Sequence, residues 1–234
     1  MTNRYFVEEP ISHSHVTLSG PEAHHLIHVM RAGPGTQVVL FDGSGAEFPA
    51  VVDSFRRSTV ELSILSRDEI SRELPMAITL GVTLPKGDRQ KWLIEKAVEL
   101  GVARVVPLST DRAVAQPVEQ AVQRLRRSVI EASKQCGRNQ LMQIDEARSW
   151  PDFIADTAGL TCRLLAHPRT NDAETELPPV MPDRVAIAVG PEGGFTDAEV
   201  ALAVDAGWQS IDLGSRILRI ETAAIAMAVL VATP

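Results

Sequence analysis

Two glycine-bearing segments near the C-terminus combine residues that could enclose and act on a small ligand. Residues 190–195 follow the apolar run 185–189, and residues 213–223 follow the short run 210–213. Each stands where a strand is expected to end and a helix to begin, and open α/β sheets bind ligands at the carboxyl ends of their strands. Because glycine lacks a Cβ, the main chain at such turns can approach a ligand closely. We therefore expect the two segments to form two walls of one crevice.

Charged residues in the second segment are the candidates for chemistry. Arg216, Arg219 and Glu221 stand among isoleucines and leucines, and charges inside an apolar stretch are usually paired or functional. A third turn, His-Pro-Arg at residues 167–169, follows the expected strand 162–166. None of these turns has the spacing of a dinucleotide fingerprint or of a phosphate loop. On its own, the glycine turn could be a tight structural turn before a capped helix, since Thr196 and Glu199 have the spacing of a capping box.

The charge distribution restricts the possible partners. The 234 residues carry a formal net charge of −7, which argues against a general nucleic-acid coat. Residues 112–138 nevertheless hold six basic residues against two acidic ones, a local charge of +4. This segment permits RNA binding, with a solvated helix face as the alternative.

Cysteine and histidine usage bears on compartment and metal binding. The chain has only two cysteines, which form neither a disulfide framework nor a metal-ligand spacing and fit a reducing cytoplasm. It begins with no apolar signal segment, and no apolar run approaches the roughly 20 residues that span a bilayer. His24 and His28 lie four apart on one expected helix face, as two metal ligands could, but no cysteine or acidic motif completes a set. We expect a cytoplasmic protein with no membrane contact and no bound metal.

The order of expected elements divides the chain into two domains, residues 1–72 and 73–234. Short strands joined by tight turns make the first domain typical of a small β-barrel. Strands that alternate with helices indicate that the second is an α/β domain with a mainly parallel sheet and helices on both faces. In the first domain we expect a helix at 19–31 and strands at 37–41, 46–54 and 59–65. In the second we expect strands at 77–83, 102–108, 162–166, 185–189 and 210–213, and helices at 88–100, 117–136, 196–206 and 221–232.

Together, the three turns resemble the cofactor loops of the ribosomal RNA small subunit methyltransferase E family. The resemblance extends over nearly the whole chain and includes residues 12–15, 28–35, 41–44, 95–102 and 135–139. The family belongs to the SPOUT class. The resemblance therefore implies a C-terminal parallel sheet tied in a trefoil knot and an N-terminal PUA-like β-barrel that binds RNA. Nothing in the periodicity of the sequence indicates the knot.

The resemblance implies a cofactor and a reaction. S-adenosyl-L-methionine would be the methyl donor, and N3 of a specific uridine in 16S rRNA would be the acceptor. Main-chain groups of Leu165, Gly190 and Leu218 are the expected contacts of the adenine, because main-chain donors and acceptors can hold a flat base between apolar side chains. The full expected cofactor-binding set is Leu165, His167, Pro168, Gly190, Pro191, Glu192, Gly193, Leu213, Gly214, Ile217 and Leu218.

Methyl transfer to N3 requires that the uracil lose its N3 proton. Arg219 is expected to stabilise the resulting anion, with Arg112 as the second candidate. Glu221 or Glu192 would orient an arginine or receive the proton. The uridine must also leave its stack to reach the site. The residues expected to contact RNA are Arg4, Arg31, Arg124, Arg126, Arg127, Lys134, Arg138 and Asn139.

The resemblance, with the apolar helix expected near the C-terminus, also implies a homodimer whose knotted domains pack together. The partner would be 16S rRNA or the small ribosomal subunit. Two residues depart from the family pattern: Ser215 replaces a common proline and Ile220 a common threonine. Neither change removes a charge, so we expect activity to survive both.

Two other functions are compatible with parts of the sequence. A non-catalytic RNA-binding or assembly factor would be expected to lose the cofactor-loop residues, yet Gly190, Glu192, Gly214 and Arg219 are all present. A nucleotide-phosphate enzyme could use the glycine turn as an anion site, but no partnering lysine or magnesium-ligand pattern accompanies it. The sequence leaves open the target nucleotide, the choice between naked rRNA and an assembled subunit, and the residue that removes the N3 proton.

Overall fold

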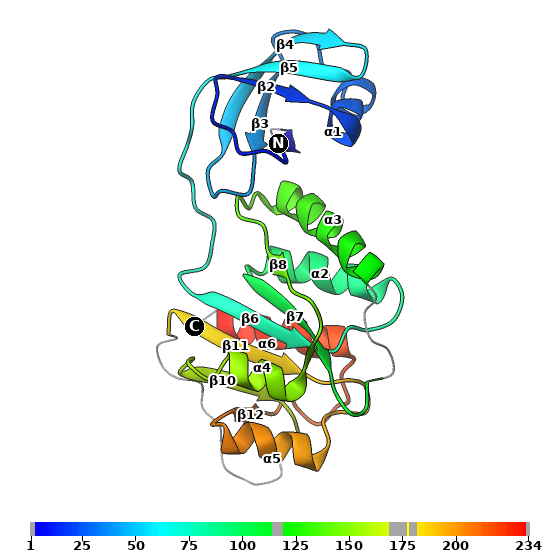
Figure 1. The fold of residues 1–234 in the computed structure, drawn as a ribbon, viewed down its shortest axis with the longest axis vertical. Helices are drawn as coiled ribbons and strands as arrows, with labels where there is room; N and C mark the ends of the chain where they lie inside the picture. Colours follow the sequence, from blue (N-terminus) through cyan, green and yellow to red (C-terminus); the bar gives the residue numbers. More distant parts are fainter. Residues whose placement is uncertain (1–2, 114–118, 169–176, 178–181, 233–234) are drawn as a thin grey trace. The chain divides into compact units, whose positions relative to one another are not determined.

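The chain folds into two compact units in its computed structural model (Figure 1), which describes residues 3–113, 119–168, 177 and 182–232. The first unit comprises residues 1–73 together with 133–141, and the second comprises 74–132 with 142–234. The sequence-based boundary after residue 72 therefore lies close to the end of the first unit's main segment. Residues 133–141 group with the first unit, although they lie within the range 73–234 expected for the second domain.

The first unit is built on a curled five-stranded sheet of order β1-β3-β4-β5-β2. Its strands are β1 (Arg4–Phe6), β2 (His15–Leu18), β3 (Gln37–Phe41), β4 (Phe48–Arg56) and β5 (Thr59–Ile64). β1 pairs in parallel with β3, and the other pairings are antiparallel. Alternate side chains of β3, β4 and β5 point into a hydrophobic core, as the period of a strand with one buried face requires. β1 and β2 were not expected, because three or four residues are too few to show an alternating pattern.

The helical segment of the first unit differs from the single helix that the sequence predicted. α1 (Gly20–His24) continues directly into a π-helical turn, η1 (His25–Val29). Pro21 stands in the first turn of α1, where its missing N–H costs no helical hydrogen bond. Arg31, just past this segment, has a φ of 50°, a left-handed conformation that is uncommon for a residue with a Cβ.

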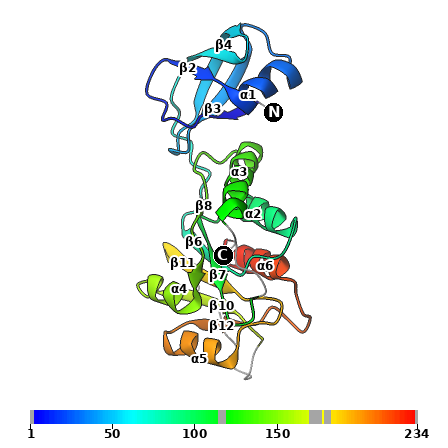
Figure 2. The ribbon, with the colours of Figure 1, turned by 45° about the vertical axis from the view of Figure 1, so that its right-hand side comes forward.

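The second unit contains a seven-stranded parallel sheet with helices on both faces. Its strands are β6 (Ala77–Val82), β7 (Arg104–Ser109), β8 (Gln143–Ile144), β9 (Arg148–Ser149), β10 (Cys162–Ala166), β11 (Arg184–Val189) and β12 (Gln209–Ile211). The order is β12-β10-β11-β6-β7-β8, with β9 also paired to β7. Its helices are α2 (Arg89–Glu99), α3 (Glu119–Cys136), α4 (Trp150–Asp156), α5 (Asp197–Asp205) and α6 (Ile220–Ala232). α2 and α6 cover one face and α4 and α5 the other (Figure 2), which confirms the α/β architecture with a mainly parallel sheet.

An aromatic cluster anchors one wall of the expected crevice. Phe195, the last residue of the glycine turn, packs on Trp150 with ring centroids 4.7 Å apart. Trp150 also packs on Trp208 at 5.5 Å and donates its indole N–H to the carbonyl oxygen of Glu199. A Cβ on Gly81 would lie 2.5 Å from the ring of Phe153 in the same cluster, so β6 can pack this closely only with glycine there. The turn after β11 therefore starts from a rigid core.

The strand order brings the three expected cofactor loops together. β12, β10 and β11 are adjacent in the sheet and parallel, so the segments that follow them leave from the same edge. β6 is the next strand after β11, and the segment that leads from it into α2 leaves from that edge too. In the described part of the chain, no helix is both long and apolar enough to cross a membrane.

Candidate functional site at the carboxyl edge of the parallel sheet

The loops after β10, β11 and β12 are shaped by hydrogen bonds within this edge. The N–H of His167 donates to the carbonyl oxygen of Ile211 at 3.1 Å, which ties the loop after β10 to β12. The N–H of Gly194 donates to the carbonyl oxygen of Pro191 at 2.8 Å and closes the glycine turn. Thr196 and Glu199 form the expected capping box at the start of α5. Arg169, the third residue of the His-Pro-Arg turn, lies outside the described residues.

The glycines at this edge differ in what surrounds the position of a Cβ. A Cβ on Gly190 would lie 2.9 Å from the ring of Phe195, so this glycine is required by packing of the turn on its own core. A Cβ on Gly193 would touch the Arg112 side chain at 3.4 Å. By contrast, no atom of the described residues lies within 4 Å of the Cβ positions of Gly194 and Gly214, whose φ angles of 68° and 99° favour glycine. Open space beside the main chain is therefore found at these last two glycines.

Arg112 holds the glycine turn from the side of β7. Its Nη1 donates to the carbonyl oxygens of Gly193 at 2.7 Å and Phe195 at 3.3 Å. The preceding N–H, of Asp111, donates to the Glu199 carboxylate at 2.9 Å. The guanidinium that the sequence offered as a second catalytic group is thus engaged with the main chain of the turn, although its side chain is exposed.

Glu192 and Glu221 share one arginine, and it is not the arginine that the sequence pointed to. Nη2 of Arg89 lies 3.5 Å from Oε1 of Glu192, and Nη1 lies 3.5 Å from Oε2 of Glu221. The Glu221 side chain is only 8% exposed, whereas that of Glu192 is 51% exposed. Arg219 is exposed, and its carbonyl oxygen accepts from the N–H of Ala223 at the start of α6. Arg89 was not among the expected site residues, although it opens a helix that follows a strand.

The segment between β12 and α6 carries an apolar side chain that is almost fully exposed to solvent. Ile217 is 98% exposed, while Leu213 and Leu218 on either side are half-buried. The N–H of Gly214 donates to Oδ1 of Asp212 at 2.7 Å, an Asx turn that fixes the start of the segment. A fully exposed isoleucine is a surface that a ligand, an RNA or a second chain can cover.

Three residues of the expected cofactor-binding set lie in β10 or in the loop directly after it. Leu165 lies within β10, fully buried between β11 and β12, so its side chain offers no ligand surface. His167 is half-buried and Pro168 exposed. Burial lowers the pKa of His167 below its ordinary value, partly offset by the charge of Asp197. The imidazole at this edge is therefore neutral at pH 7.

Four of the eight expected RNA contacts are at least half-buried and form polar contacts within the first unit. Glu47, itself 9% exposed, accepts hydrogen bonds from Arg4 at 2.8 Å, Arg72 at 2.9 Å and Asn139 at 3.3 Å. Arg4 also donates to the Asn139 side chain, and its guanidinium lies 5.0 Å from the centre of the Phe41 ring. Burial raises the Glu47 pKa, but the hydrogen bonds from Arg72 and Arg4 outweigh it, so the pKa lies below its ordinary value.

The other two of these residues, Arg138 and Lys134, lie in the segment that returns to the first unit. Arg138 is buried and forms an ion pair with Glu73 at 2.5 Å. Lys134 lies 2.9 Å from the Glu22 carboxylate and 5.8 Å from the centre of the Tyr5 ring. Together with Arg4 and Asn139, these residues fix residues 133–141 in the first unit. Their side chains are therefore engaged within the protein.

The remaining four expected RNA contacts are exposed. Arg124, Arg126 and Arg127 lie on α3, and Arg31 follows η1 in the first unit. Of these, Arg126 also donates from Nη2 to the carbonyl oxygen of Ile144 at 3.2 Å.

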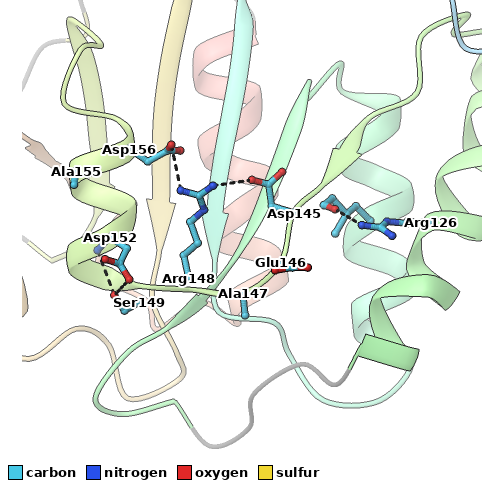
Figure 3. A pocket seen from close by; sticks show the side chains of 10 residues that line it. Arg126, Asp145, Glu146, Ala147, Arg148, Ser149, Asp152, Ala155 and Asp156 are labelled. Carbon is cyan, nitrogen blue, oxygen red and sulfur yellow. Dashed lines mark hydrogen bonds and ion pairs between the residues drawn. The ribbon is translucent and has the colours of Figure 1, made fainter.

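A hollow of about 770 Å³ lies elsewhere in the second unit (Figure 3). Its charged groups largely satisfy one another: Arg148 forms ion pairs with Asp156 at 3.2 Å and with Asp145 at 3.7 Å. Arg104 joins the same two carboxylates, at 2.8 Å and 2.5 Å. None of the expected cofactor-binding residues lines this hollow, so its size alone does not make it the candidate site.

His24 and His28, considered as a metal pair, lie with ring centroids 4.6 Å apart. They line a second hollow, of about 440 Å³, together with Arg57 and Ser58. Among the described residues, no third His, Cys, Asp or Glu joins them in a group that could hold a metal ion.

Comparisons with known proteins assign this edge to a family. A family model described as an RNA methyltransferase domain matches residues 72–232, and one described as an RNA methyltransferase PUA domain matches residues 18–65. The chain is 33% identical over 219 residues to the ribosomal RNA small subunit methyltransferase E of Synechocystis, covering 92% of this chain and 72% of the relative. The protein of the same name from Bacillus subtilis is 28% identical over 235 residues, covering 94% and 92%.

Solved structures agree with the sequence relatives. A putative methyltransferase from Legionella pneumophila, in complex with the bound cofactor SAM, aligns with a TM-score of 0.90 and 32% identity over 99% of this chain and 97% of that one. A ribosomal RNA small subunit methyltransferase E from Neisseria gonorrhoeae, bound to S-adenosyl methionine, aligns with a TM-score of 0.85 and 29% identity over 98% and 96%. With its edge of three adjacent loops and these relatives over nearly its whole length, the chain belongs to the ribosomal RNA small subunit methyltransferase E family.

Proposed function

We propose that this chain binds S-adenosyl-L-methionine at the carboxyl edge of its parallel sheet and transfers the methyl group to N3 of a specific uridine in 16S rRNA. The observation that carries the proposal is the position of the loops after β10, β11 and β12, which leave adjacent strands at one edge. The relatives that bind S-adenosyl methionine support the cofactor. We also propose a cytoplasmic location, because ribosomal RNA is the proposed substrate.

The residues of this edge fit such a cofactor. In the part of the chain that the structure describes, no atom fills the space beside Gly194 and Gly214 that a Cβ would occupy. Two buried hydroxyls just beyond β6 and β7, those of Thr83 and Thr110, have no hydrogen-bond partner among the described residues, and buried polar groups normally have one. The expected cofactor-binding residues of the three loops, His167, Pro168 and the members at 190–193, 213–214 and 217–218, are the ones we propose to hold it. When bound, the cofactor supplies an electrophilic methyl group on a sulfonium.

The protein's own part in the reaction is to handle one proton and one negative charge. Uracil N3 must lose its proton before its lone pair can form the new N–CH₃ bond. Glu192 and Glu221 are the carboxylates we propose as acceptors or positioning groups for this step. Arg219, exposed beside the buried Glu221, is the cation we propose to stabilise the uracil anion. Arg112 supports this arrangement by holding the glycine turn through its carbonyls.

RNA binding in this proposal relies on the exposed arginines. Arg124, Arg126 and Arg127 on α3, with Arg31, would contact the phosphate backbone and release counterions. Such a local basic surface reconciles RNA binding with the net charge of −7.

A homodimer completes the proposal. Ile217 and the α6 residues Val229 and Leu230 are exposed apolar side chains of the second unit, a composition that favours burial against another chain. Closed two-fold dimers are the commonest assembly of soluble proteins, and a dimer formed here would place the loop after β12 beside the partner.

The test is methyl transfer from tritiated S-adenosylmethionine to small-subunit rRNA, supplied naked and in assembled subunits. The product should be a single N3-methyluridine, located by nuclease digestion and mass spectrometry. A non-catalytic assembly factor would bind the RNA without transfer. Methylation of a different base or of a ribose would contradict the proposed acceptor.

A further inference from the structure

Arg89 joins two walls of the site although it belongs to none of the three loops. It is the first residue of α2 and follows the segment that leaves β6. One of its guanidinium nitrogens faces Glu192 on the glycine turn after β11, and another faces Glu221 in the first turn of α6, each at 3.5 Å. A single side chain thus connects two carboxylates that are far apart in the sequence.

The two halves of this connection differ in rigidity. α2 packs against α6, so Arg89 and Glu221 sit on neighbouring helices, and Glu221 is almost fully buried. Glu192 lies on an exposed turn, so its carboxylate stays close to Arg89 only while the turn keeps its conformation. We take Arg89–Glu221 as the fixed half and Arg89–Glu192 as the half that restrains the turn.

Arg112 acts on the same turn in a different way. Its guanidinium donates directly to the carbonyl oxygens of Gly193 and Phe195. The turn is therefore held at its end by main-chain contacts to Arg112 and near its start by the Glu192 side chain. Without Arg89, the start of the turn would lose this restraint, and two carboxylates would face the site without the cation that separates them.

We infer that Arg89 is a positioning residue: from the buried Glu221 it holds Glu192, and through Glu192 it keeps the glycine turn in the form that receives the cofactor. This inference rests on the proposed function for its purpose, but the restraint itself is a property of the protein without cofactor. The contact distances of 3.5 Å and the partial exposure of Arg89 make the restraint weak enough to yield when a ligand or RNA enters.

The experiment measures hydrogen exchange of the Gly194 amide, which reports on the turn through its bond to the Pro191 carbonyl oxygen. In the cofactor-free protein, Arg89→Gln and Glu192→Gln should each speed this exchange by roughly two- to fivefold, the range expected for a partly exposed ion pair. The double variant should be no faster than either single one, because both remove the same contact. Arg89→Lys should restore part of the protection, since one ammonium cannot span both carboxylates as a guanidinium does.

Lys91→Gln is the matched control. Lys91 lies on the same helix and pairs with Glu95 at 3.6 Å on an exposed face, so its loss removes equal charge without touching the site. The inference is overturned if Arg89→Gln changes Gly194 exchange no more than Lys91→Gln does, or if the effects of Arg89→Gln and Glu192→Gln add in full. If Arg89→Gln does not fold, Glu192→Gln and Glu221→Gln still test the inference. Each removes one of the two ion pairs of Arg89 and should speed exchange of the Gly194 amide.

Calorimetry with S-adenosylmethionine separates this inference from the proposed function. We expect Arg89→Gln to weaken cofactor binding by the same factor by which it speeds Gly194 exchange. If the wild-type protein shows no binding, the proposed function fails, while the exchange measurements still test the restraint. If the cofactor binds equally to the wild type and to Arg89→Gln with a loosened turn, the turn does not receive the cofactor and the inference is wrong.

Discussion

Replacing Arg4 by alanine tests whether this residue stabilises the first unit or binds RNA. Sequence resemblance made Arg4 an RNA contact, whereas the structure buries it against Glu47, Asn139 and Phe41. Arg4→Ala should therefore act first on the stability of the first unit. Removing one partner of a buried ion pair costs about 3–5 kcal/mol, and we expect about 3 kcal/mol, because Arg72 still neutralises Glu47 from its more exposed position.

The magnitude converts into a measurable shift. For a unit of this size, an m-value of about 1.5 kcal/mol per molar urea gives a loss of about 2 M in the unfolding midpoint. All three tryptophans lie in the second unit, so their fluorescence follows that unit alone. Hydrogen exchange of the amides in β3 and β4 follows the first unit. The variant should lower the midpoint reported by these amides and leave the tryptophan transition in place.

Control variants make the result decisive. Arg67→Ala removes an arginine from an exposed pair with Glu69 at 2.9 Å in the same unit, and such pairs contribute little to stability.

Because the pKa of Glu47 is lowered in the folded protein, its contribution to stability is present above its unfolded pKa and is lost as the pH falls through the folded value. Arg4→Ala should make that acid-side loss shallower. An Arg4→Ala protein as stable as Arg67→Ala, but with weakened RNA binding, would refute the structural reasoning.

Four further predictions follow from the site and its surfaces. Arg124→Ala combined with Arg127→Ala should weaken rRNA binding and lower the slope of log affinity against log salt by roughly one unit for each arginine, measured by filter binding; an unchanged slope would leave them as a solvated helix face. Arg219→Ala should cut the single-turnover rate by roughly 10²–10³ while cofactor affinity changes little, with a smaller defect at high pH where uracil ionises unaided; a wild-type rate would end that assignment. Leu230→Asp should shift the sedimentation of a dimer towards monomer, whereas a wild-type protein that is already monomeric and fully active would remove the proposed dimer. The pKa of the His167 imidazole, measured by NMR titration, should lie below 6.5. Its contribution to the free energy of unfolding should be complete above pH 6.5 and should fall as the pH drops towards the pKa of the folded protein. A pKa above 6.5 would contradict burial as the dominant cause.

The sequence by itself determined the elements whose pattern is local. The apolar run 185–189, the glycine turn after it and the capping pair Thr196 and Glu199 predicted the end of β11 and the start of α5. The helix at 221–232 was expected within one residue of its observed start. Strand periodicity, helix caps and turn glycines act over a few residues, so a single sequence records them directly. The short strands β1, β2, β8 and β9 and the seven-residue helix α4 are too brief to leave such a pattern.

Tertiary structure alone decided which charged residues are available to a ligand. Arg4 and Asn139, separated by 135 positions, meet in the first unit, and Arg89 meets Glu221 across 132 positions. Nothing local distinguishes a buried, paired arginine from an exposed one, because the difference lies in partners that other parts of the chain bring. Strand order likewise decided that the loops after β10, β11 and β12 are neighbours, whereas the knot stays a prediction from resemblance. The types of residue that can do chemistry are written in the sequence, but their pairing and exposure follow from long-range contacts that only the folded chain creates.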